Sequence, residues 1–248
     1  MQERIYVGID DTDILGAIRG TGKLARELID VLPGDYRCRG VVRQQLLVDP
    51  AIPYTSHNSA ACLILEGPVE RGLDTLVECA AKHIKRHFLA GSDPGLCVAA
   101  ADAARRLIDF GRTCTRKVVT QRDALQAAKG SDLVGLGGSN DGIIGSAAAV
   151  GLTATGWSGR YIEYGLLRAL PESMPVGKLE SIGIQVLSLD RDAMVPAADD
   201  LVHTNRWVRP RLVGNLPVLL VVPKGSGEWV NIGEKRRKES VDKARRRN

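Results

Sequence analysis

The sequence lacks paired cysteines, long apolar runs and a signal peptide, the features that would assign it to a disulfide-rich, membrane or secreted class. Its five cysteines are an odd number and include no C-x-x-C pair, which argues against a disulfide framework and against a structural zinc site. No run approaches the roughly 18 apolar residues that a membrane helix needs, and the N-terminus does not look like a signal peptide. We therefore expect reduced thiols, a cytoplasmic location and no membrane partner.

The basic character of the chain is confined to its C-terminus. The sequence holds 34 basic and 29 acidic residues; eight and three of these lie in residues 234–248, which leaves 26 of each in residues 1–233. We interpret 234–248 as a basic, solvated and partly disordered tail. Because such a run can also bind phosphates, an RNA-binding protein that acts through its tail remains an alternative function.

Apolar periodicity predicts an α+β protein with two lobes. The elements expected in the first hundred residues are, in order, 4–9, 21–32, 37–48, 60–66, 70–88 and 96–98. Their order, βαββαβ, is typical of a ferredoxin-like fold. A small mixed α/β lobe and a short C-terminal extension follow, with helices near 99–110 and after the capping box Thr120–Asp123, and strands at 160–168, 182–189 and 217–222.

Three carboxylates, Asp10, Asp11 and Asp13, follow the first predicted strand directly. Like charges this close repel one another unless a positive group lies between them. Oxygen ligands of this kind suit Mg²⁺, which commonly takes one or two carboxylates together with substrate phosphates. Because side chains alternate along a strand, at most two of the three are expected to share a metal ion. The alternative is that they form Asx turns and cap the next helix.

A glycine-rich turn, residues 16–23, comes next and resembles a P-loop without matching its pattern. Lys23 is followed by Leu24, where the pattern requires Ser or Thr. The glycines still allow backbone N–H groups to approach an anion at a helix N-terminus. The predicted phosphate ligands are Gly16, Gly20, Gly22 and Lys23. Thr21 is an N-cap, a phosphate ligand or a phosphate acceptor.

A second glycine-rich segment, GLGGSNDGIIGSAAAVG, spans residues 135–151. Its run of small residues after Gly145 predicts a helix that packs closely against a sheet. The loop before that helix is a candidate to line a ligand pocket at the helix N-terminus. The predicted ligand-binding residues of this loop are Asn140, Asp141 and Gly142.

Three segments together resemble one family. GIDDTD at 8–13, DPAIPYTSHNSAACLIL at 49–65 and GGSNDGIIGSAAAVG at 137–151 are similar, in this order, to the archaeal agmatinylcytidine synthetases that modify the wobble cytidine of an isoleucine tRNA. The resemblance covers roughly residues 4–190 and corresponds to the catalytic half of that family. About 50 residues follow the second lobe, with no cysteine after Cys114, so we expect the OB and zinc-ribbon domains of the family to be absent.

The resemblance implies Mg²⁺ and ATP near Asp10, Asp11 and Asp13, and a phosphate-accepting threonine at Thr21. It also implies a kinase-like domain at 1–114, a ferredoxin-like substrate domain at 115–195 and a β extension at 196–233, before the tail. The predicted function is an ATP-dependent transferase or ligase core, with a nucleoside or small-molecule hydroxyl or carbonyl as phosphate acceptor and a tRNA or small amine as partner. A non-catalytic nucleotide-binding or metabolite-binding module is the second alternative.

Overall fold

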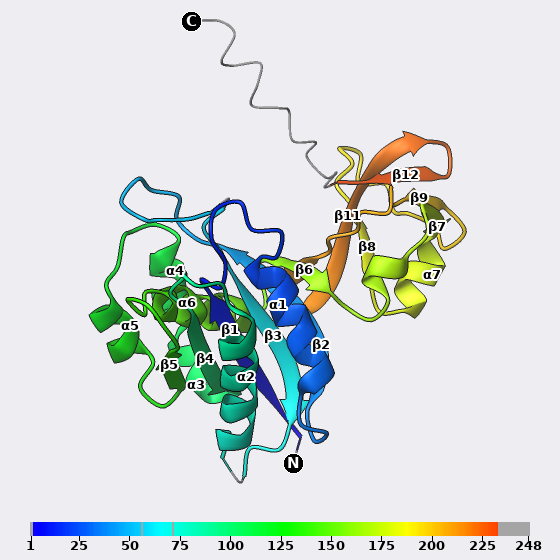
Figure 1. Ribbon diagram of the computed structural model, residues 1–248. Helices are drawn as coiled ribbons and strands as arrows, with labels where there is room; N and C mark the ends of the chain where they lie inside the picture. Colours follow the sequence, from blue (N-terminus) through cyan, green and yellow to red (C-terminus); the bar gives the residue numbers. More distant parts are fainter. Residues whose placement is uncertain (1, 56, 71, 233–248) are drawn as a thin grey trace, which may run out of the picture. The chain divides into compact units, whose positions relative to one another are not determined.

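The computed structural model describes residues 2–55, 57–70 and 72–232 (Figure 1). Contacts divide the chain into a larger unit, Met1–Gly165 with Arg211–Pro217, and a smaller unit, Leu166–Pro210 with Val218–Asn248. The predicted tail at 234–248 falls outside the described residues. The expected boundary between residues 114 and 115 lies inside the larger unit, and the expected domain at 115–195 is shared between the two units.

The larger unit is built on an antiparallel sheet with the predicted ferredoxin-like order. The βαββαβ elements are β1 (Glu3–Asp10), α1 (Thr21–Glu27), β2 (Arg37–Gln45), β3 (Ser59–Gly67), α2 (Asp74–His87) and β4 (Gly95–Ala100). Their strands lie in the spatial order β4-β1-β3-β2, and β1 pairs antiparallel with both β3 and β4. The predicted α+β class and the βαββαβ order are therefore confirmed, within residues 3–100.

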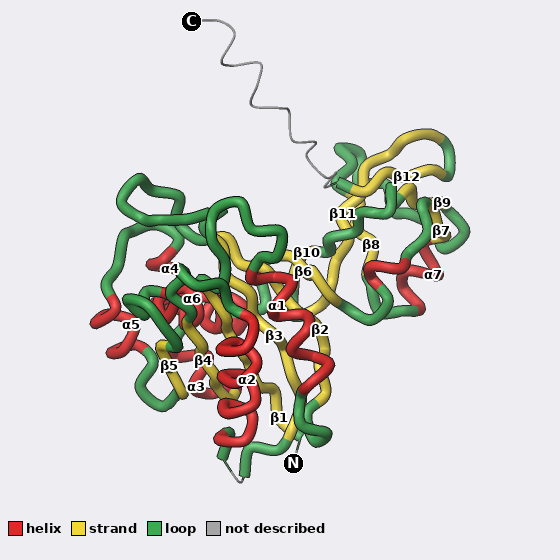
Figure 2. The backbone as a smooth tube through the Cα atoms, viewed as in Figure 1, coloured by secondary structure: helices red, strands yellow, loops and turns green. Residues whose placement is uncertain are grey.

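The two faces of this sheet pack differently. Ile5, Val7 and Ile9 alternate along β1 and form one core with residues of α1 and α2. On the opposite face Gly8 meets α6 (Gly142–Ala154), and a Cβ on Gly8 would collide with the carbonyl oxygen of Ser146. In Figure 2, α1 and α2 accordingly lie in front of the strands and α6 lies behind them. Glycine and alanine in α6 permit this close approach, as the small-residue run predicted.

Further elements extend the sheet at both edges. β5 (Asp132–Gly135) pairs with β4, β6 (Arg160–Glu163) pairs with β2, and β10 (Arg211–Val213) pairs with β6. The helix expected near 99–110 is interrupted at Leu107 into α3 (Ala101–Arg106) and α4 (Ile108–Cys114). The predicted capping box is present at α5 (Gln121–Ala127), where Thr120 and Asp123 bond reciprocally. Residues 115–165 thus complete the ferredoxin-like sheet.

The strands of the smaller unit pair in both parallel and antiparallel fashion. Its strands are β7 (Ser173–Pro175), β8 (Gln185–Ser188), β9 (Leu201–His203), β11 (Leu216–Gly225) and β12 (Glu228–Asn231), with the short helices η2 (Leu167–Ala169) and α7 (Val176–Ser181). The predicted strands at 182–189 and 217–222 correspond to β8 and β11. The segment between the predicted strands 160–168 and 182–189 contains β7 and α7. Among the described residues, no helix combines the length and the apolar character needed to cross a membrane.

Candidate functional site

The chain leaves the sheet abruptly after β1, and that exit places the predicted carboxylates. β1 ends at Asp10, and Asp11 has a φ of 51°, a left-handed conformation that aspartate adopts more readily than most residues. The strand cannot continue through such a residue. Asp10 and Asp11 therefore lie at the strand end beside the N-terminus of α6, because β1 and α6 are packed together.

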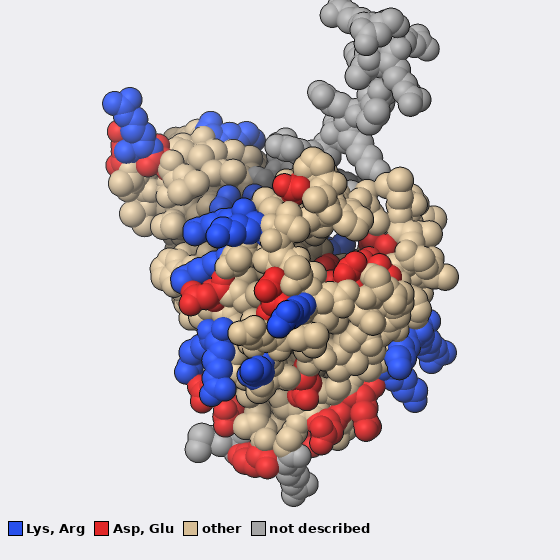
Figure 3. Space-filling model, turned by 90° about the vertical axis from the view of Figure 1, so that its left-hand side faces the viewer, with Lys and Arg blue, Asp and Glu red and all other residues tan. Residues whose placement is uncertain are grey.

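A cavity of about 180 Å³ lies at this end of the sheet. It is lined by Asp10, Asp11, Leu46, Ala51, Ile52, Pro53, Asn58, Cys114, Lys117, Val118, Val119, Asp141, Gly142, Ile144 and Gly145. Three of the contributing segments are far apart in sequence: the end of β1, the loop at 46–58 and the start of α6. Each of the three segments that suggested the family resemblance thus supplies part of one cavity wall. In Figure 3, acidic side chains gather around a hollow on one face of the protein.

Asp10 carries a strongly perturbed carboxyl group. Burial raises its pKa to about 7, and the neighbouring negative charge of Asp11 adds to the shift. The carboxylate lies against the first turns of α6, where a Cβ on Gly145 would collide with it. Gly145 therefore makes room for Asp10, and the positive end of the helix dipole faces a negative side chain.

Asp11 belongs to a second set of carboxylates around the same helix start. Burial raises its pKa to about 6, and the charge of Asp93 is the next largest contribution. Asp93 accepts hydrogen bonds from the backbone N–H and the hydroxyl of Ser139, at 2.8 and 2.9 Å. Asp141 accepts from Gln121 at 2.6 Å. Asp10 and Asp11 each have one backbone donor, from Asp11 and Asp93 respectively, and both carboxylates line the cavity.

Asp13 has a different role from its two neighbours. One carboxylate oxygen accepts the backbone N–H of Thr21 at 3.2 Å, and the other accepts the hydroxyl of Thr55 at 3.0 Å. Asp13 thereby caps the N-terminus of α1, although it lies eight residues before Thr21 in the sequence. Helix capping was the alternative to metal binding that the sequence allowed for the three aspartates. Asp13 does not line the cavity.

Thr21 is the first residue of α1, and the N-cap position itself is Gly20. Thr21 is buried, and its hydroxyl accepts the hydroxyl of Thr12 at 3.1 Å. Of the three roles considered for Thr21, the N-cap role is therefore wrong. Its hydroxyl joins the start of α1 to the loop that carries the carboxylates.

The other predicted ligands divide into two groups. Asp141 and Gly142 line the cavity, whereas Asn140 has a φ of 65° and its side chain packs on Gly135. Gly16, Gly20, Gly22 and Lys23 are not among the residues that line the cavity. The ammonium group of Lys23 lies 3.9 Å from a carboxylate oxygen of Glu27, on the exposed surface of α1. Phosphate binding by this turn stays a prediction.

Three residues at or next to the cavity were not predicted as site residues from the sequence. Lys117, the one cation among the described residues that line the cavity, comes from the segment between α4 and α5. Asn58 reaches it from the loop before β3 and donates to the carbonyl of Leu47 at 2.6 Å. Asp93 stands in a Gly-Ser-Asp-Pro turn directly before β4, and that turn signal could have drawn attention to it.

Within the described residues, no three Asp, Glu, His or Cys side chains form a group that could hold a metal ion alone. Asp10 and Asp11 supply only oxygen ligands, and neither has a described ion pair. Such a pair fits Mg²⁺ when phosphate oxygens complete its coordination.

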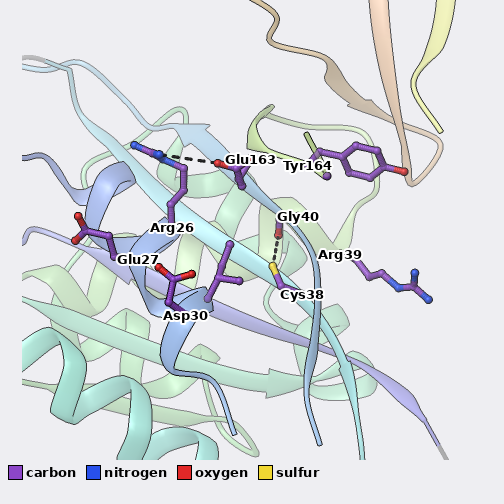
Figure 4. Close-up of a pocket in the computed structure, with 10 residues that line it drawn as sticks. Arg26, Glu27, Asp30, Cys38, Arg39, Gly40, Glu163 and Tyr164 are labelled. Carbon is purple, nitrogen blue, oxygen red and sulfur yellow. Dashed lines mark hydrogen bonds and ion pairs between the residues drawn. The ribbon is translucent and has the colours of Figure 1, made fainter. Parts of the chain in front are cut away.

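A second and larger cavity, of about 420 Å³, is a weaker candidate (Figure 4). It lies between α1 and the edge formed by β2 and β6. Its charged groups compensate one another, as Arg26 and Glu163 do at 3.9 Å. Burial raises the pKa of the Cys38 thiol to about 11, so this side chain is protonated and a poor nucleophile at neutral pH. None of the three motif segments lines this cavity.

Comparison with known proteins gives matches only among solved structures. No family model matches the chain, and no curated protein matches it. A complex of TiaS with an isoleucine tRNA and ATP matches at 24% identity with a TM-score of 0.52, over 60% of this chain and 36% of that chain. The matched part of the chain shares the fold of the corresponding part of that structure. A tRNA fluorescent labelling enzyme matches at 24% identity and a TM-score of 0.50, with the same coverage.

A third match is apo TiaS, described as an isoleucine-tRNA agmatidine synthetase, at 23% identity and a TM-score of 0.49, over 60% of this chain and 35% of that chain. The first match confirms the predicted resemblance as a likeness of fold to one part of a larger protein. This chain spans about a third of the length of the structures that it matches.

Proposed function

We propose that this protein is an ATP-using, RNA-modifying enzyme whose cavity at the end of β1 is the active site. The observation that carries the proposal is the convergence of three distant segments on one cavity wall that contains two perturbed carboxylates. The shared fold supports it, since the matched structure is described as a complex with a tRNA and ATP. The proposed substrates are a nucleoside triphosphate, a tRNA nucleoside and, in a second step, a small amine.

The residues of the cavity suggest how the chain would act. Asp10 and Asp11 would hold Mg²⁺, which neutralises phosphate charge when it is bound. Lys117, and the N-terminus of α6 beside Asp10, would bind and orient the triphosphate. Apolar groups from Ile52, Pro53 and Val118 would exclude water from the reacting phosphate. Asp13 and Thr21 would fix the loop that positions both carboxylates. Catalysis would consist mainly of positioning and charge stabilisation.

Phosphate release is the direct test of this function. The purified protein with Mg²⁺ and ATP is expected to release inorganic phosphate, faster when tRNA and a small amine such as agmatine are present. Asp11→Asn should remove the activity, because one of the two carboxylates is lost. Asp109→Asn, on the exposed surface of α4, is the matched control and should retain the wild-type rate. Tight ATP binding without phosphate release would instead support a non-catalytic nucleotide-binding module.

Thr21 remains a proposed phosphate acceptor, and its position allows a sharp test. If it relays phosphate, incubation with Mg²⁺ and ATP should phosphorylate Thr21 in the wild-type protein, as detected by mass spectrometry. Thr21→Ser keeps a hydroxyl, so this variant should also be phosphorylated and should turn over ATP. Thr21→Ala should retain nucleotide binding and lose turnover.

A structural role for Thr21 predicts the opposite pattern. The hydroxyl of Thr12 loses its buried acceptor in Thr21→Ala, which costs about 1 to 3 kcal/mol in the free energy of unfolding. Turnover per folded molecule would then equal that of the wild type, and no phosphothreonine would form in the parent protein. Urea unfolding and mass spectrometry together separate these two outcomes.

A further inference from the structure

Three arginines stand side by side at one level of the sheet in the larger unit. Arg43 of β2 pairs with Arg160 of β6, and Arg160 pairs with Arg211 of β10. Residues paired directly across neighbouring strands point to the same face. Since strands lie about 4.8 Å apart, the row spans roughly 10 Å. We call these three residues the arginine row.

The row is not neutralised by the residues that the structure describes. Arg43 donates a hydrogen bond from Nε to the hydroxyl of Ser59 at 2.9 Å, and none of the three arginines has a described ion pair. Burial and the charge of Arg160 lower the pKa of Arg43, and burial and the charge of Arg211 lower the pKa of Arg160. Like charges directly opposite one another destabilise a sheet. The arrangement is therefore unfavourable in the free protein.

Some other arginines in the same unit have acidic partners. Arg39, on the same strand as Arg43, lies 2.5 Å from a carboxylate oxygen of Glu66. Arg105 lies 2.7 Å from Asp102 on α3. Three guanidinium groups in a row, without a described acidic partner, are the arrangement expected of a site for an external anion, because guanidinium groups bind phosphate oxygens in a fork geometry.

The row also lies at the end of the sheet that carries the candidate active site. Arg43 pairs with Ala61, and Ala61 pairs with Ile9, so the row projects from the face of the sheet that carries α1, whereas the next residue, Asp10, projects toward α6 on the opposite face. Arg43 is thus two strands, or about 10 Å, from β1. Its hydrogen bond to Ser59 turns the guanidinium toward the end of β3 next to the carboxylate loop. Arg160 and Arg211 continue the row outward and are exposed.

We propose that the arginine row binds consecutive backbone phosphates of the RNA substrate, and that the strand then passes over the end of the sheet to reach the cavity at Asp10 and Asp11. The inference rests on the proposed function only for the choice of RNA as ligand. An RNA backbone supplies several phosphates in a line, as does the row of guanidinium groups. The row binds them without reading sequence, since phosphates carry no sequence information.

The test measures binding of a single-stranded RNA of about 15 nucleotides to the full chain at several salt concentrations. Each neutralised phosphate contributes about 0.7 to the slope of log K against log salt for single strands. Arg160→Gln with Arg211→Gln should therefore reduce the magnitude of the slope by about 1.4 and the affinity at 0.15 M salt about tenfold. The melting temperature should stay the same or rise, because repulsion within the sheet is removed.

Arg39→Gln is the matched control on β2, and it should leave the RNA affinity and the slope unchanged. Equal losses in this control, or an unchanged slope in the double variant, would overturn the proposal. ATP affinity is measured on the same variants. A loss of ATP affinity with unchanged RNA binding would show that the row binds the nucleotide, and it would overturn the proposal that the row binds RNA. ATP turnover by the wild-type protein tests the proposed function separately. The salt dependence of RNA binding can fall in the double variant even if the wild-type protein releases no phosphate.

Discussion

Asp10→Asn is expected to weaken Mg²⁺–ATP binding at least about tenfold, or roughly 1.4 kcal/mol, and to stabilise the metal-free protein. The first effect follows because one of the two proposed metal ligands loses its charge. The second follows because the wild-type carboxylate is buried beside Asp11, with no described cation as a partner. Removing a buried like charge should raise the free energy of unfolding by about 1 to 3 kcal/mol.

The opposite signs of these two effects make the experiment informative. Calorimetry measures nucleotide affinity with Mg²⁺, and urea unfolding in a chelator measures stability. Asp109→Asn, an exposed carboxylate with an i,i+3 arginine partner, should change neither quantity appreciably. A stabilised Asp10→Asn protein with wild-type affinity would show that the carboxylate takes no part in binding. Loss of both affinity and stability would show instead that Asp10 supports the fold.

Gly8→Ala should destabilise the protein by about 2 to 3 kcal/mol through overpacking. The added Cβ would collide with the carbonyl oxygen of Ser146 in the backbone of α6, and it would lie 2.9 Å from a methyl carbon of Val150. A backbone carbonyl inside a helix cannot rotate away as a flexible side chain can. The helix would have to move off β1, which would carry Gly142 and Gly145 away from Asp10 and reduce nucleotide binding as well.

Gly34→Ala is the matched control, because a Cβ there meets no atom within 4 Å and Gly34 lacks a positive φ. It should be neutral or slightly stabilising. For a protein of this size the loss in Gly8→Ala corresponds to a fall in melting temperature of about 4 to 12 °C. Equal melting temperatures for both variants would contradict the close packing of α6 on β1.

Local patterns in the sequence were sufficient to predict the βαββαβ order and the identity of its helices and strands. The apolar run at residues 5–9 predicts a strand, and the structure places Ile5, Val7 and Ile9 of that strand in a core. The capping box at Thr120 and Asp123 was equally local and is confirmed. Signals of this kind suffice because they depend only on residues within a few positions of one another.

The family resemblance singled out three sequence segments that line the cavity, but the sequence did not distinguish the roles of residues within each segment. Asp10, Asp11 and Asp13 look equivalent in the sequence. In the structure the first two line a cavity, while Asp13 holds the N-terminus of α1 and the Thr55 hydroxyl. The left-handed backbone conformation of Asp11 directs the chain so that Asp13 lies outside the cavity that Asp10 and Asp11 line. The spacing of the three aspartates in the sequence does not predict this conformation.

Which distant residues share a site depends on the tertiary fold. Lys117 and Asn58 enter the cavity, and the Gly16–Gly22 turn supplies none of its lining residues, because the packing of α6 on β1 selects which loops meet at that end of the sheet. The arginine row is a stronger example. Arg43, Arg160 and Arg211 are separated by 117 and 51 positions, and strand register alone makes them neighbours. Register depends on long-range pairing, so a property of the whole sheet determines where these charges meet.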